Sequence, residues 1–221
     1  MTEVLYRWPA AAKFGRQIPK NKFYEHGTVS TALREKFVAE VQRITWAYKL
    51  AESTINLPSS PEVPEIQVFQ IEAKTDDVGE PVIAAIDKAV QYPVIFEVAR
   101  TTGGHSEVRM TAALKQLGSG TLKLSAYYST GWQARETTRH PLPTAITLPS
   151  LYATLLQPLT SLAVRPSEEM SEVADRLAAV RKLERQVAAL ERKIRTEPQL
   201  NRKIELRRQL KERQAALASL M

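Results

Sequence analysis

The residues with the clearest chemical potential are Glu72 and Lys74, which end an alternating apolar segment at residues 65–74. If this segment is a strand, side chains at positions i and i+2 point to the same face of the sheet. A carboxylate and an amine held side by side can bind Mg²⁺ and orient a water molecule against a phosphate, as in nucleases with a (D/E)xK motif. One hypothesis is therefore a metal-dependent nuclease centred on Glu72 and Lys74. The simpler alternative is a surface pair of opposite charges, which contributes little energy.

Other catalytic motifs do not occur in the sequence. The three histidines lie far apart, without the HxH or HExxH spacing of a metal site. The GxxxxGK[ST] phosphate loop and the GxGxxG dinucleotide motif are absent as well. With no cysteine, the chain has neither disulfides nor thiolate metal ligands. We therefore expect no catalytic residue, metal or other cofactor, apart from Mg²⁺ under the nuclease hypothesis.

A first group of basic residues that could contact phosphate is in residues 18–25. Lys20 and Lys22 precede two adjacent aromatic residues, Phe23 and Tyr24. The amines could bind phosphates while a ring stacks on a base. Alternatively, the rings pack in the core and the lysines are only solvated.

A larger basic group lies near the C-terminus. From Arg176 to Arg213 the chain has 13 basic and 5 acidic residues, a net charge of +8, compared with +7 for the whole chain. Few glutamates lie four residues from an arginine, so most arginines lack a partner within their own helix. Guanidinium groups bind phosphates and carboxylates through paired hydrogen bonds. The alternative is that these charges pair between helices or stay solvated. The predicted binding residues are Arg181, Arg185, Arg192, Arg195, Arg202, Arg207 and Arg208.

The spacing of apolar residues predicts two helices for this C-terminal segment. Apolar residues recur every three or four positions from Val173 to Ile194, and a second apolar seam runs from Leu200 to Leu220. Between them lies Pro198, which a helix tolerates only in its first turn. We expect an antiparallel coiled-coil hairpin of residues 166–221, with Ser167 as the first N-cap. A single kinked helix that dimerises through the same seam is the alternative.

The remaining residues, 1–165, predict a separate sheet domain. Helical or alternating patterns follow one another along it as helix, strand, helix, three strands and helix. This order indicates an α+β (or α/β) domain, with a small mixed sheet of about four strands covered by helices. The predicted helices are 30–50, 81–90 and 150–162, and the predicted strands are 65–74, 93–99, 107–114 and 122–129.

Length and composition agree with this organisation. The chain has 221 residues, enough for one domain and an appendage, and 43% hydrophobic and 25% charged residues are ordinary for a globular protein. No apolar run is long enough to span a membrane, and the N-terminus lacks a secretory signal pattern. We therefore expect a cytoplasmic protein with no membrane partner. The excess of basic residues favours an anionic partner.

Several stretches together resemble a bacterial family, "domain of unknown function 4391". They are Ile18–Glu25, Ile44–Leu50, Thr54–Pro58, Glu65–Lys74, Ile86–Ala89, Tyr92–Phe96 and Gln199–Leu206. The resemblance implies a gene beside DEAD-type helicases and DNA methyltransferases in restriction-like, anti-phage regions, and hence a helper in DNA defence. It carries no catalytic residue with it. Pro198 is a departure from the family pattern.

Three functions follow as hypotheses. The leading one is a non-catalytic accessory protein of an antiviral DNA-defence module, which docks onto a helicase or methyltransferase-type subunit, onto DNA, or onto both. The second is the nuclease. The third is a homo-oligomeric scaffold, for example a homodimer, whose C-terminal helices pair between copies.

Overall fold

The first of two compact units has a sheet at its centre. The structure is a computed structural model that describes residues 4–24, 29–116, 123–160 and 170–221. The chain divides into the units Met1–Thr160 and Ser161–Met221. The boundary predicted near Pro166 and the cap predicted at Ser167 lie outside the described residues.

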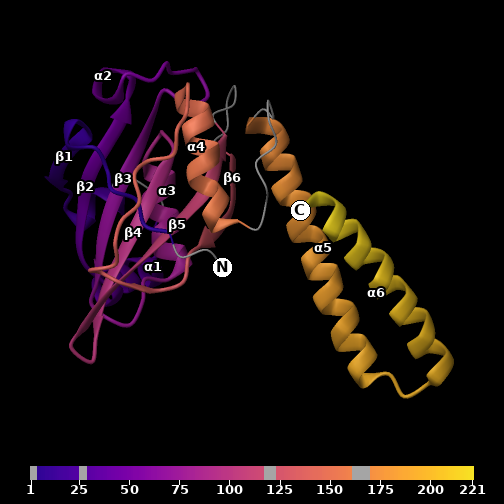
Figure 1. Ribbon diagram of the computed structural model, residues 1–221. Helices are drawn as coiled ribbons and strands as arrows, with labels where there is room; N and C mark the ends of the chain where they lie inside the picture. The colour runs from indigo at the N-terminus through magenta and orange to yellow at the C-terminus, as the bar shows by residue number, and fades with distance from the viewer. Residues whose placement is uncertain (1–3, 25–28, 117–122, 161–169) are drawn as a thin grey trace. The chain divides into compact units, whose positions relative to one another are not determined.

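Within the described residues, seven strands form one sheet in the order β1-β2-β3-β4-β5-β6, with β7 paired to β5 (Figure 1). Only β3 and β4 are parallel, and the other neighbouring strands are antiparallel. The fold is therefore mixed α+β, with a larger sheet than the four strands expected. The strands are β1 (Lys13–Gln17), β2 (Val41–Ala51), β3 (Glu65–Ala73), β4 (Val94–Thr102), β5 (His105–Gln116), β6 (Lys123–Ser129) and β7 (Gln133–Ala134).

The prediction of one helix over residues 30–50 is wrong. Helix α1 (Thr31–Glu40) starts at the N-cap Ser30, whose hydroxyl accepts a hydrogen bond from the Leu33 amide at 3.3 Å. It ends at Glu40, and strand β2 follows directly. Two register irregularities in β2 explain the error, because each bulge shifts the inward-facing position by one residue. Four of the five buried side chains of β2 have a spacing of three, which imitates a helix: Val41, Ile44, Ala47 and Leu50.

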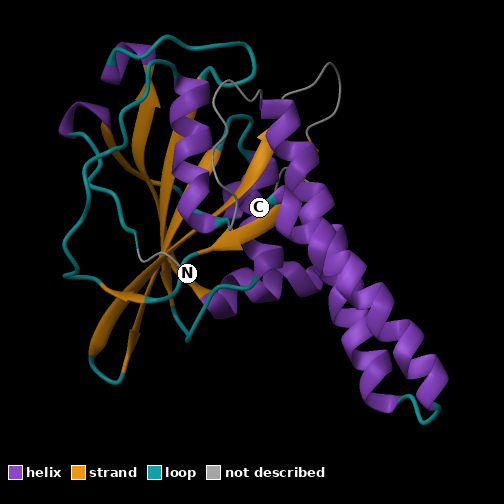
Figure 2. Ribbon diagram, turned by 45° about the vertical axis from the view of Figure 1, so that its right-hand side comes forward, coloured by secondary structure: helices purple, strands orange, loops and turns teal. Residues whose placement is uncertain are grey.

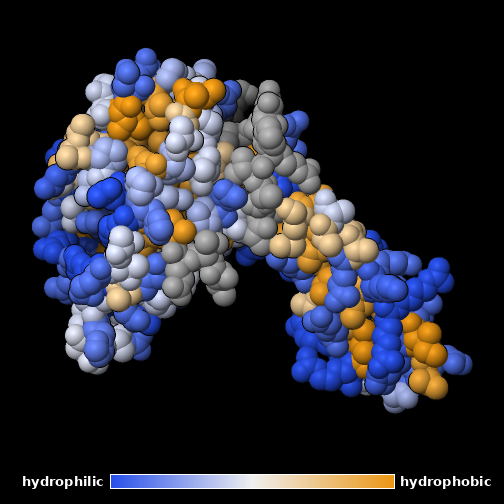
Figure 3. All heavy atoms as spheres, viewed as in Figure 1, coloured by the Kyte–Doolittle hydropathy of each residue, from blue (hydrophilic) through white to orange (hydrophobic). Residues whose placement is uncertain are grey.

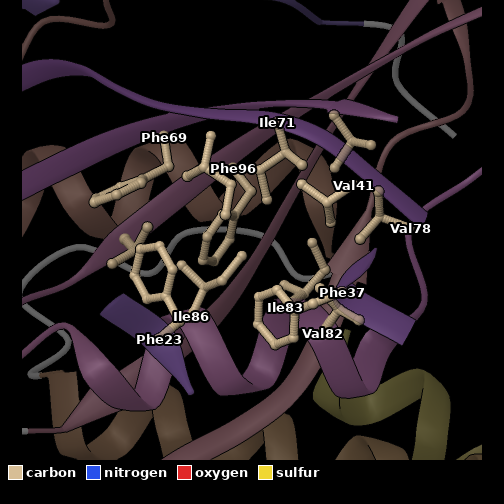
Figure 4. Packing of buried hydrophobic residues seen from close by; sticks show 13 residues of the cluster. Phe23, Phe37, Val41, Phe69, Ile71, Val78, Val82, Ile83, Ile86 and Phe96 are labelled. Atoms are coloured by element: carbon tan, nitrogen blue, oxygen red, sulfur yellow. The ribbon is translucent and has the colours of Figure 1, made fainter. Parts of the chain in front are cut away.

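Helices cover both faces of the sheet (Figures 1 and 2). Helix α3 (Glu80–Ala89) connects the two parallel strands, as a parallel pair requires. With α1 it buries one face of the sheet in the cluster of Figure 4, where Phe37 and Ile83 meet Phe96. Helix α4 (Leu148–Leu156) lies on the opposite face. The short elements are α2 (Glu52–Ile55) and the 3-10 segments Ala10–Ala12, Lys20–Phe23 and Gln157–Leu159.

The second unit contains two helices, α5 (Met170–Thr196) and α6 (Leu200–Leu220). The helical backbone is interrupted between them, next to Pro198. The two helices run side by side (Figure 2), and the Arg176 guanidinium in α5 donates a hydrogen bond to the Leu220 carbonyl at the end of α6, at 3.3 Å. None of the described helices combines the length and apolar character needed to cross a bilayer.

Candidate functional site

Glu72 and Lys74 have separate partners in the structure. The Glu72 carboxylate forms an ion pair with Arg43, the residue opposite it on β2, and its side chain is 33% exposed. The Lys74 ammonium lies beyond the end of β3 and donates a hydrogen bond to the Val38 carbonyl at 2.7 Å. The structure therefore uses Glu72 in a cross-strand pair and Lys74 to bind the last turn of α1.

A metal-dependent nuclease would need further carboxylates next to Glu72. Asp77 binds Arg109 at 2.8 Å, and Glu97 accepts hydrogen bonds from Trp8 and Arg139 at 2.8 and 2.6 Å. Across the described ranges, no group of three or more His, Cys, Asp or Glu side chains could hold a metal ion. Asp77 and Glu97 thus take part in other interactions.

The segment around Lys20 packs against α1. Phe23 is buried, and its ring stacks on Phe37 with centroids 6.5 Å apart. The Lys20 ammonium donates a hydrogen bond to the Val41 carbonyl at 2.8 Å, and burial, followed by the nearby Lys74, lowers the pKa of Lys20. Lys22 is exposed. Of the two predicted phosphate-binding lysines in this segment, only Lys22 extends its side chain into solvent.

The seven arginines predicted to bind an anion lie on α5 and α6, and all except the half-buried Arg181 are exposed. Arg202 pairs with Glu197 at 3.5 Å and Arg208 with Glu212 at 3.4 Å. Such exposed pairs are worth at most about 1 kcal/mol. Among the described residues, the other five have no acidic group within 4.0 Å: Arg181, Arg185, Arg192, Arg195 and Arg207.

Apolar side chains accompany these charges. Hydrophilic side chains gather on the face of α5 and α6 seen in Figure 3, with apolar side chains between them. Leu200 and Ile204, in the first turns of α6, are 69% and 56% exposed. The second unit therefore presents cationic and apolar groups together.

A pocket in the first unit was not predicted from the sequence. Its volume is about 410 Å³, and its walls are the N-terminal end of α3, strands β5 and β6, and Trp132. The Arg109 guanidinium donates hydrogen bonds to Asp77 and to the Ser129 hydroxyl at 2.8 and 2.9 Å. Arg100 lies over the Trp132 ring, 3.9 Å from its centroid. No local motif could have identified this pocket, because its residues come from four separate segments.

A buried ion pair lies below the pocket. Lys115 is fully buried, and its ammonium is 2.5 Å from the Asp87 carboxylate. Tyr127 lines the pocket, and its hydroxyl donates a hydrogen bond to the other Asp87 oxygen at 2.7 Å. Burial raises the pKa of Asp87, and burial together with the Asp87 charge raises the pKa of Tyr127. Tyr127 therefore remains a neutral hydroxyl that connects the pocket to the core.

The fold and these surfaces define a mixed α+β protein that carries an Arg-rich helical unit. The chain belongs to the family described as domain of unknown function (DUF4391), whose model matches residues 7–217. The match covers nearly the whole chain and confirms the resemblance seen in the sequence. No curated protein and no solved structure matched the chain.

Proposed function

We propose that this protein is a non-catalytic accessory protein that docks onto DNA, or onto a helicase or methyltransferase-type subunit, through the arginines of α5 and α6. One observation carries this proposal. Five of the seven arginines have no acidic group within 4.0 Å in the part of the chain that the structure describes. Guanidinium groups that are not neutralised internally remain available for phosphates or carboxylates of a partner. The cytoplasmic DNA-defence setting belongs to the same proposal and is supported by the family resemblance.

The two helices are proposed to work as an antiparallel coiled-coil hairpin within one chain. The interruption next to Pro198 and the hydrogen bond from Arg176 to Leu220 support this arrangement. Pairing within the chain would leave the charged flanks of both helices open to a partner. In the scaffold alternative, the helices would pair with those of a second copy instead. Sedimentation equilibrium distinguishes the two, because a monomer has a mass of 24.8 kDa and a dimer twice that mass.

The docking proposal is tested by the salt dependence of DNA binding. Fluorescence anisotropy would follow the full chain on labelled duplex and single-stranded DNA from about 50 to about 300 mM NaCl, where counterion release dominates the salt response. The test variant carries Arg181→Glu, Arg185→Glu and Arg192→Glu. We expect weaker binding and a log–log slope on duplex DNA that is shallower by about 0.9 for each phosphate that the variant no longer neutralises.

A matched control reverses three exposed cations of the first unit: Arg7→Glu, Lys36→Glu and Lys88→Glu. This variant has the same net charge as the test variant, so it corrects for the general effect of charge. We expect it to keep most of the wild-type slope. If both variants lose the same affinity, the binding is diffuse and the proposed surface is wrong. If wild-type binding does not respond to salt, DNA is not the partner, and the same variants are then compared on a helicase encoded by a neighbouring gene.

A further inference from the structure

The polar groups that line the pocket beside α3 are mainly hydrogen-bond acceptors. Three of its lining residues carry hydroxyl groups, and each hydroxyl uses its proton within the protein. Ser129 donates to the Thr111 hydroxyl at 2.8 Å, and Thr111 donates to the Tyr128 carbonyl at 3.1 Å. Tyr127 donates to the buried Asp87 carboxylate at 2.7 Å. Since a hydroxyl has only one proton, these groups can offer a ligand nothing but acceptor lone pairs.

The one cation that lines the pocket in the described part of the chain, Arg109, is almost fully engaged. Its Nε and one Nη2 proton bind Asp77 at 3.2 and 2.8 Å, and the Nη2 group also contacts the Val78 carbonyl at 3.4 Å. One Nη1 proton binds the Ser129 hydroxyl at 2.9 Å. A guanidinium has five N–H groups, so a single N–H of Arg109 remains. Its charge is neutralised by the Asp77 carboxylate.

The remaining charge in the pocket is negative. Glu80 is exposed at the first turn of α3 and has no hydrogen bond or ion pair with any described residue. Its charge contributes, after burial and Asp87, to the raised pKa of the Tyr127 hydroxyl, and both residues line the pocket. The hydrogen bonds to Asp77 all reach its Oδ1 atom, which leaves Oδ2 as a second acceptor. The lining therefore has a net charge of −1.

The positive end of α3 is already occupied. The Glu40 carboxylate accepts a hydrogen bond from the Gly79 amide at 2.8 Å, at the N-cap of the helix. This interaction offsets the helix dipole, which would otherwise favour an anion here. The Trp132 ring already has two guanidinium groups of the chain over it, those of Arg100 and Arg109 at 3.9 and 5.3 Å from the ring centroid, so it is not counted among the groups that would hold a ligand.

We propose that this pocket binds a primary ammonium or guanidinium group, held by Glu80 and by the acceptor oxygens of Asp77, Tyr127 and Ser129. An anion would meet two carboxylates and hydroxyl groups whose protons are already used, with a single N–H of Arg109 as donor. The proposal is independent of the docking function assigned to α5 and α6, since it concerns the first unit alone.

The experiment is a titration of the full chain with agmatine, putrescine and inorganic phosphate. Isothermal titration calorimetry and tryptophan fluorescence measure the binding. We expect the two cations to bind and phosphate not to bind. Glu80→Gln, which keeps the size of the side chain, should weaken cation binding by about tenfold or more, because a charged acceptor is replaced by a neutral one. Glu80→Lys places an ammonium at the pocket mouth and should abolish binding.

The matched control is Glu35→Gln, an equal loss of charge at an exposed position on α1, which should leave the affinity unchanged. Phosphate binding at the pocket, or cation binding that is the same in wild type and Glu80→Gln, would overturn the proposal. The peptide acetyl-Gly-Arg-Gly-amide identifies the source of the cation. Tighter binding of the peptide than of agmatine indicates an arginine of a protein partner, whereas equal or weaker binding indicates a free amine.

Discussion

Among single residues, Lys115 has the most demanding environment. Its side chain is fully buried on β5, yet its ammonium contacts the Asp87 carboxylate and three backbone carbonyls. Two of these carbonyls, those of Asp87 and Val90, lie at the C-terminal end of α3, where a helix leaves carbonyl groups without internal partners. Lys115 thus joins the central sheet to the end of a helix.

We predict that Lys115→Met destabilises the protein by about 3–5 kcal/mol, because it leaves the Asp87 carboxylate buried without its cation. Urea unfolding followed by circular dichroism measures the change. Lys88→Met is the control, since Lys88 is exposed on the same helix as Asp87. Its effect should stay within about 0.5 kcal/mol. Equal effects of the two substitutions would show that the buried pair has no special importance.

Tyrosines with raised pKa values predict a loss of stability at alkaline pH. Burial raises the pKa of Tyr152 and Tyr127 above the ordinary value of 10.0. The folded protein therefore keeps both hydroxyls protonated, whereas the unfolded chain releases these protons near pH 10. A group with a raised pKa stabilises the fold fully below its unfolded pKa and less as the pH rises. The free energy of unfolding should thus fall above about pH 10, by about 1.4 kcal/mol per pH unit for each tyrosine.

Tyr152→Phe tests this expectation. The substitution removes two buried hydrogen bonds, one donated to the Ala113 carbonyl at 2.8 Å and one accepted from the Lys115 amide at 3.2 Å, which should together cost about 2 kcal/mol at neutral pH. Above about pH 10, however, the variant should lose stability less steeply than the wild type, by about 1.4 kcal/mol per pH unit, because one titrating group is gone. Urea unfolding between about pH 8 and pH 11 gives both values. If the free energies of unfolding of the two proteins fall in parallel above about pH 10, Tyr152 does not contribute to the alkaline loss of stability.

At the scale of elements, Glu40 connects two helices. It is the last residue of α1, and its carboxylate accepts the hydrogen bond from the Gly79 amide at the start of α3. A side chain from another helix therefore does what the N3 glutamate of a capping box normally does within one helix, because it accepts from the amide of the N-cap residue. We predict that Glu40→Ala lowers stability by about 1–2 kcal/mol, whereas Glu35→Ala on the exposed face of α1 changes it little. Thermal unfolding of both variants measures this, and equal melting temperatures would exclude a capping role.

The elements that could be predicted from sequence are those with a regular period. Strand β3 and helix α3 lie within one residue of their predicted limits, because an uninterrupted strand or helix keeps its apolar period. The hairpin between β4 and β5 has Gly103 and Gly104 at φ 58° and 80°, which glycine adopts without strain. Strand β1 could not be predicted, since all five of its residues are exposed and no alternation remains.

The candidate sites were less predictable than the fold. The arginines of α5 and α6 follow from local composition, so the sequence alone identified them. The pocket instead depends on Asp77, Arg109, Tyr127 and Trp132, which only the strand order brings together. The spacing of Glu72 and Lys74 indicated that they share a face of a strand, but it could not show that Arg43 lies opposite Glu72. Pairing across strands is set by register, which a short motif does not contain.

For the whole molecule, we predict that the purified protein leaves duplex and single-stranded DNA intact in the presence of Mg²⁺ or Mn²⁺. The reason is that Glu72 is paired with Arg43, while Asp77 and Glu97 bind other side chains. Gel electrophoresis after prolonged incubation measures cleavage. Cleavage by the wild type that is lost in Glu72→Ala, but kept in Glu136→Ala at an exposed site, would establish the nuclease instead.

The outer strand β1 has one more consequence. An outermost strand exposes unpaired amides and carbonyls that can recruit a strand from another molecule and so begin aggregation. Here the strand is short, its register shifts between Lys13 and Arg16, and Gly15 has a φ of 69°. A strand from another molecule would find an irregular row of hydrogen-bonding groups, flanked by the positive charges of Lys13 and Arg16. This border of the sheet thereby resists edge-to-edge growth, which favours solubility of the folded chain at high concentration.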